Sequence, residues 1–114
     1  MTRQHALALE SRRSVTQHAL AIAWLAQDIT KSQAITPQEA QQSGESAARI
    51  LSAITTGDGI PESVQQSSRV LVRIGNSMAS GKIPSAGQTD LLTQIAAEVW
   101  LTLTHAAEDD GVPL

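Results

Sequence analysis

The chain has 114 residues, a formal net charge of −3 and no cysteine. This length is enough for one domain with its own core, and the missing thiols exclude disulfides, iron–sulfur clusters and thiolate zinc sites. The acidic balance gives no general attraction to nucleic acid. No apolar run approaches the roughly 20 residues of a membrane span and no signal-peptide core follows Met1, so we expect a cytoplasmic protein.

A single long helix is predicted over residues 2–31, around the apolar run 19–26. A capping box at residues 14–17 allows a later start near residue 14. Leu20 and Trp24 lie on the side opposite the regular apolar stripe. A helix that is apolar on both sides is either wrapped by other helices, which would bury Trp24, or shared with a partner. The inner stripe consists of Val15, Ala19, Ile22, Ala26 and Ile29.

The second and third helices are predicted from clear start and stop signals. Thr36 and Glu39 form a capping box around Pro37, and this helix stops at Gly57. Pro61 opens the next helix, which stops before residue 81. The residues expected to face inward are Ala40, Ala47, Ile50, Leu51 and Ile54 in the second helix, and Val64, Leu71, Ile74 and Met78 in the third.

Residues 37–57 and 61–81 align without a gap at an offset of 24. Their inward and outward faces coincide, which is the pattern of a duplicated helix unit. Chance similarity remains the alternative, because Gln and Ser are abundant and every helix needs a start and a stop. Two units are also fewer than the three or so that a repeat array needs.

The fourth helix is predicted over about residues 89–107. Trp100 borders its inner stripe and is expected in the core, whereas Leu101 lies on the polar side. The acidic residues 108–110 would oppose the dipole at a helix C-terminus, so residues 108–114 are expected to form a loose tail. The prediction is one all-α domain over residues 1–107, a four-helix bundle with short connections. The inner stripe consists of Leu92, Ile95, Val99, Leu103 and Ala106.

No sequence pattern predicts catalysis, a cofactor or a metal. Residues 75–82 look like a phosphate loop, but five residues separate the glycines instead of four and no strand precedes them. The histidines His5, His18 and His105 lack the spacing of a metal site, and no serine sits in a nucleophile elbow. We therefore expect a protein that is not an enzyme.

Arg69 and Arg73 lie one turn apart among polar residues, and Arg49 could join them if the second and third helices are neighbours. Such a face could meet phosphate or acidic partners. The alternative function is therefore a small helical DNA-binding transcriptional regulator, with these two helices as a helix-turn-helix. The simpler interpretation is that Arg69 and Arg73 belong to a helix face that is only exposed to solvent.

The favoured function is a non-catalytic protein-binding module, an adaptor, antagonist or inhibitor of a larger protein. Interfaces draw most of their energy from a few aromatic or Arg anchors. The candidate protein-binding residues are Leu20, Trp24, Arg69, Arg73 and Leu101. We also expect a homodimer through the first helix. In size, charge and helicity the chain resembles small bacterial or phage antagonist proteins, including anti-CRISPR proteins and antiactivators, a likeness that implies a protein partner.

Overall fold

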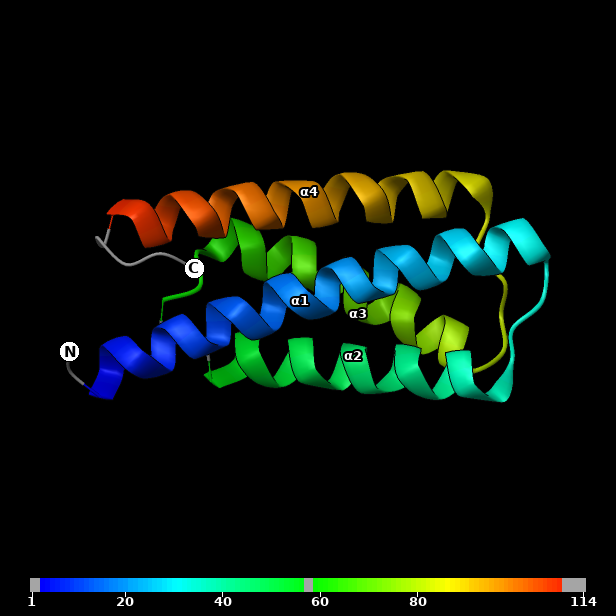
Figure 1. Ribbon diagram of the computed structural model, residues 1–114, viewed down its shortest axis with the longest axis horizontal. Helices are drawn as coiled ribbons and strands as arrows, with labels where there is room; N and C mark the ends of the chain where they lie inside the picture. The colour runs from blue at the N-terminus through cyan, green and yellow to red at the C-terminus, as the bar shows by residue number, and fades with distance from the viewer. Residues whose placement is uncertain (1–2, 57–58, 110–114) are drawn as a thin grey trace.

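The computed structural model describes the backbone of residues 3–56 and 59–109 and the side chains of residues 9–56 and 59–105. It contains four α-helices: α1 (Arg3–Ser32), α2 (Pro37–Thr56), α3 (Glu62–Ala79) and α4 (Ala86–Asp109). The helices run up and down along the long axis of the molecule (Figure 1). Each helix packs against its neighbours in sequence, and α4 closes the ring on α1. The predicted all-α four-helix bundle is confirmed.

Helix α1 supplies the centre of the core. Its predicted inner stripe is correct, because all five members of that stripe are fully buried. The helix runs unbroken through Ser14, so the alternative start at that residue is wrong. It ends where Gln33 takes a left-handed backbone conformation, φ 56°, and donates its N–H to the carbonyl of Ile29 at 2.7 Å.

Helices α2 and α4 begin with the same capping device. At α2 the Thr36 N–H donates to Glu39 Oε1 at 3.0 Å, and the Glu39 N–H donates to Thr36 Oγ1 at 3.1 Å, as predicted. Ser85 and Gln88 exchange equivalent bonds of 2.9 and 3.1 Å. This second capping box was missed in the sequence. It starts α4 at Ala86, three residues before the predicted start.

The predicted C-terminal boundary of α4 is also corrected. The helix continues to Asp109, so residues 108 and 109 belong to it and not to a tail. The unfavourable dipole interaction of acidic residues, about 0.3–1 kcal/mol on an exposed end, is too small to stop a helix here. Residues 110–114 lie outside the described residues.

Small residues let α2 and α3 approach closely. The Ser43 hydroxyl donates to the carbonyl of Gly75 at 2.6 Å inside the core. A Cβ atom at Gly75 would lie 3.1 Å from Ile22 Cδ1 and 3.2 Å from Ala47 Cβ, which is tighter than ordinary contact. Gly75 is therefore the point at which α1, α2 and α3 meet.

Three residues expected inside are not fully buried. Trp100 is 47% exposed and Leu51 is 42% exposed, while Ala40 is half-buried. In each case the apolar arc is wider than the strip of helix that neighbouring helices cover, so its edge reaches solvent.

The buried faces of α2 and α3 do coincide at the offset of 24, since Ala47, Ile50 and Ile54 are buried as are their counterparts Leu71, Ile74 and Met78. The duplication itself stays a prediction, and Gly57 lies outside the described residues. Among the four described helices, none combines the length and the hydropathy that crossing a bilayer requires.

Candidate protein-binding surface

Two hydrogen bonds show the register between α1 and α4. Gln27 Nε2 donates to Thr93 Oγ1 at 3.0 Å, and the hydroxyls of Thr30 and Thr89 lie 2.7 Å apart. Two helical turns are close to seven residues, and the helices are antiparallel. Seven residues before Gln27 is Leu20, and seven after Thr93 is Trp100. These two side chains therefore lie level with each other at the shared edge of the two helices.

Seven residues before Thr30 is Ala23, and seven residues after Thr89 is Ala96. Both alanines are buried. Small residues thus line the seam beneath Leu20 and Trp100, while the two larger side chains lie above it. Leu20 is 40% exposed and Trp100 is 47% exposed. The α1–α4 pair is therefore closed by alanines at this level and leaves large apolar groups outside.

Trp24 extends this exposed region. It lies one turn after Leu20 on the outer side of α1 and is 71% exposed. Ala97, one turn before Trp100 on α4, is exposed as well. We name Leu20, Trp24, Ala97 and Trp100 the aromatic face. It carries both aromatic residues of the chain.

The exposure of Trp24 excludes the interpretation in which neighbouring helices bury it. Leu101 is 49% exposed and follows Trp100 on the outer side of α4, at the rim of the aromatic face. The structure thus gathers three of the predicted binding residues, Leu20, Trp24 and Leu101, on the α1–α4 side. Their role in binding stays a prediction.

The position of Trp100 at the border of the inner stripe of α4 predicts a core residue, and its exposure shows that this prediction is wrong. The sequence also contains a feature that favours a position at the edge of the core. The residues that share its edge of the helix, Thr93 and Thr104, are polar. An edge with threonines on either side of one tryptophan is typical of a boundary position.

The two remaining predicted binding residues lie elsewhere. Arg69 and Arg73 are exposed on α3, which is diagonal to α1 in the bundle and lies behind it in Figure 1. The structure does not bring them to the aromatic face. Arg49 does not join them, because it lines the groove between α1 and α2, close enough to His18 to affect its pKa.

The arrangement of α2 and α3 bears on the helix-turn-helix alternative. Recognition of DNA by that motif uses two helices crossing at roughly 90–120°. Here α2 and α3 run antiparallel along the bundle, with α3 inclined to α2, and pack against each other (Figure 1). Only two cations, Arg69 and Arg73, stand on the outer side of α3 among its described residues.

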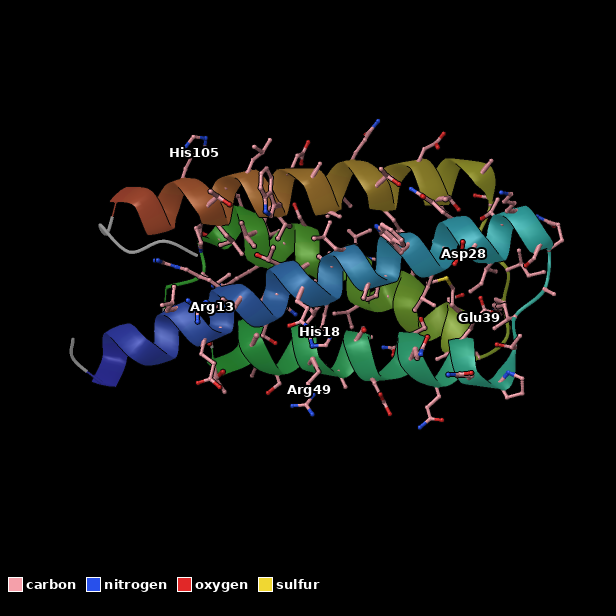
Figure 2. All side chains as sticks on the ribbon, in the orientation of Figure 1. Arg13, His18, Asp28, Glu39, Arg49 and His105 are labelled. Carbon is pink, nitrogen blue, oxygen red and sulfur yellow. The ribbon has the colours of Figure 1, made fainter. Side chains whose placement is uncertain are left out.

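An open groove of about 630 Å³ lies between α1 and α2, next to the aromatic face. Trp24 forms one wall, and Asp28, Glu45 and Arg49 contribute charges of both signs. Figure 2 shows His18 on the part of α1 that borders α2. Its Nδ1 lies 3.2 Å from the hydroxyl of Ser46.

The environment of His18 keeps its imidazole neutral near pH 7. Partial burial lowers the pKa of His18 below its ordinary value near 6.5, and repulsion by the Arg49 guanidinium lowers it further. A neutral imidazole can accept or donate a hydrogen bond to Ser46. The groove therefore offers neutral and charged polar groups beside an exposed indole.

No cluster of three or more His, Cys, Asp or Glu side chains that could hold a metal occurs among the described residues. Comparisons with protein-family models, with characterised proteins and with solved structures find no match to this chain.

Proposed function

We propose that this protein is a non-catalytic protein-binding module, an adaptor, antagonist or inhibitor that docks on a larger protein through its aromatic face. The observation that carries the proposal is the placement of both tryptophans, Trp24 and Trp100, on one exposed face. Tryptophan is among the residues most enriched at binding hot spots. A contiguous exposed apolar patch on a small protein commonly marks such a site.

The surroundings of the aromatic face resemble the anatomy of an interface. The apolar centre is bordered by polar side chains, with Gln17 on α1, Gln27 and Thr93 across the seam, and Arg49 and Glu45 in the adjoining groove. Interfaces generally have an apolar centre and a polar rim that can be hydrated. Self-association through α1 is a competing use of this face, because a second copy would cover Leu20 and Trp24 in place of the larger protein.

The side chains on the face are also held on rigid elements. Leu20 and Trp24 stand on a helix whose opposite side is fully buried, and Trp100 stands on one tied to it by two hydrogen bonds. A rigid aromatic surface loses little conformational entropy when a partner binds. This favours recognition of a preformed surface over wrapping of a flexible segment.

Capture of proteins from the source organism tests the proposal. The variant Trp24→Ala/Trp100→Ala should lose partners that wild type retains, with affinity reduced about 30-fold or more, equivalent to at least about 2 kcal/mol. Trp24→Ala alone should change the free energy of unfolding of the monomer by no more than about 0.5 kcal/mol, because the side chain is largely exposed.

The control is Leu51→Ala, which removes from α2 a large apolar side chain that is 42% exposed, close to the 47% of Trp100. It should leave the captured partners unchanged. Capture that survives loss of both tryptophans but disappears in Arg69→Ala/Arg73→Ala would contradict the proposal. A steep salt dependence of binding to random duplex DNA would then favour the DNA-binding alternative.

A further inference from the structure

One line of exposed residues runs along the outer side of α1. They follow one another at steps of three, four, three, four, four and three, so they share one side of the helix. Every member is exposed. We name this line the α1 stripe; its members are Glu10, Arg13, Gln17, Leu20, Trp24, Asp28 and Lys31.

The charges of the α1 stripe lie at its two ends, with the apolar residues between them. Glu10 and Arg13 precede the apolar centre, and Asp28 and Lys31 follow it; Figure 2 shows Arg13 and Asp28 towards opposite ends of α1. Within residues 9–32 these four are the exposed charges of α1, since Arg12 is buried and donates to the carbonyl of Gly59 at 2.9 Å.

The order of the charges is self-complementary when the helix is reversed. A two-fold axis midway between residues 20 and 21 brings Glu10 opposite Lys31 of a second copy. The same axis brings Arg13 opposite Asp28. By symmetry each pair forms twice. No ion pair joins any of these four charges to another described residue of its own chain.

Other arrangements lose this complementarity. In a parallel pair each residue meets its own copy, which places Glu10 against Glu10 and Arg13 against Arg13. An antiparallel pair displaced by one heptad leaves Arg13 facing Ala21 or residues beyond the end of the stripe. One register alone pairs all four charges with opposite charges.

We propose, on the basis of the proposed protein-binding function, that the occupant of the α1 stripe is a second copy of this chain, packed antiparallel about an axis between Leu20 and Ala21. Trp24 then lies over Gln17 of the second copy. Trp100, level with Leu20, lies beside the axis, so both copies contribute α4 to the edge of the interface.

The two kinds of contact have different roles in this dimer. Exposed ion pairs stabilise only weakly, but unfavourable pairing of like charges discriminates strongly between arrangements. Burial of Leu20 and Trp24 supplies most of the affinity. The charges therefore set orientation and register, and the apolar centre holds the copies together.

Sedimentation equilibrium of the wild-type protein, with single-cysteine crosslinking, tests the arrangement. The chain has no cysteine of its own. Ala21→Cys, next to the axis, should crosslink to itself through a short bismaleimide. Glu10→Cys should not, because its two copies lie roughly 30 Å apart at 1.5 Å per residue, but it should crosslink to Lys31→Cys in a mixed sample. A parallel dimer would give the opposite result for Glu10→Cys.

Charge exchange tests the register without changing the apolar centre. Arg13→Asp or Asp28→Arg should each weaken dimerisation about tenfold, because each turns two attractive pairs into repulsive ones. The double variant Arg13→Asp/Asp28→Arg should restore the wild-type dissociation constant to within about threefold, since it reverses both signs. Arg73→Asp on α3 makes the same charge change outside the stripe and should have no effect.

The outcomes separate this inference from the proposed function. A monomer at every concentration overturns the dimer; if capture of another protein is still lost in Trp24→Ala, the stripe belongs to that protein and the proposed function stands. If Arg13→Asp/Asp28→Arg does not restore the wild-type dissociation constant of the dimer, the antiparallel register is wrong. Capture that is indifferent to both tryptophans overturns the proposed function, whatever the oligomeric state.

Discussion

The α2–α3 pair and the α1–α4 pair are built from similar helices but differ in how completely they bury their apolar residues. Between α2 and α3, Ser43 and Gly75 allow backbone approach and a hydrogen bond of 2.6 Å. Leu51 is the large hydrophobic residue of that pair that is substantially exposed among its described residues. The α1–α4 pair leaves Leu20, Trp24, Leu91, Trp100 and Leu101 exposed.

The difference shows where this bundle is complete without a partner. A Cβ atom added at Gly75 would lie closer to Ile22 and Ala47 than ordinary packing distances, so the α2–α3 side has little room for a larger residue there. On the α1–α4 side, alanines close the seam and the large apolar groups stand outside it. Packing alone does not need those groups there, and this asymmetry supports a binding role for the aromatic face.

Truncation of matched leucines should give the largest contrast. Leu71→Ala, at a fully buried position of α3, should lower the free energy of unfolding by about 2–5 kcal/mol through lost burial and the cavity left behind. Leu101→Ala, at a position 49% exposed, should change it by about 0.5 kcal/mol or less. Urea denaturation of both variants at one low protein concentration measures this. Similar losses would mean that the two sides do not differ in packing.

The two fully buried serines should respond with opposite signs. Ser43→Ala removes the hydrogen bond to Gly75 and should destabilise the protein by about 1 kcal/mol. The Ser68 hydroxyl has no hydrogen-bond partner among the described residues. Ser68→Ala therefore removes a buried unsatisfied group and should stabilise by up to about 1 kcal/mol. Thermal melts of both variants check the signs, and destabilisation by Ser68→Ala would mean that its hydroxyl has a partner.

The smallest expected effect is a pH dependence that arises from the α1–α2 side. The pKa of His18 is lowered in the folded state, so between that pKa and about 6.5 the unfolded chain binds more protons than the folded chain. The stabilising contribution is present above about pH 6.5 and is lost as the pH falls through the lowered pKa. Denaturation of wild type and His18→Gln over this range measures the difference. If the free energy of unfolding changes equally with pH in wild type and in His18→Gln, His18 contributes no pH dependence.

The fold could be predicted from the sequence in most respects. The 3.6-residue period of apolar side chains and the capping box at Thr36 and Glu39 are local properties, and they determined the number of helices and the buried stripe of α1. The boundaries of α4 were wrong by a few residues. The capping box at Ser85 and Gln88 was also readable in the sequence, whereas the weak dipole effect of the acidic end was overestimated.

The exposed surface required the tertiary structure. The sequence is compatible with Trp24 on a wrapped helix or on a shared one. It predicts Trp100 in the core and allows Arg49 as a neighbour of Arg69 and Arg73. Periodicity gives the side of a helix that faces the core, but not how far neighbouring helices extend around its flanks. That extent depends on which helices are adjacent and on their register, which between α1 and α4 places Gln27 opposite Thr93. Sequence therefore determined the elements and their inner faces, and tertiary packing alone decided which large apolar side chains remain in solvent.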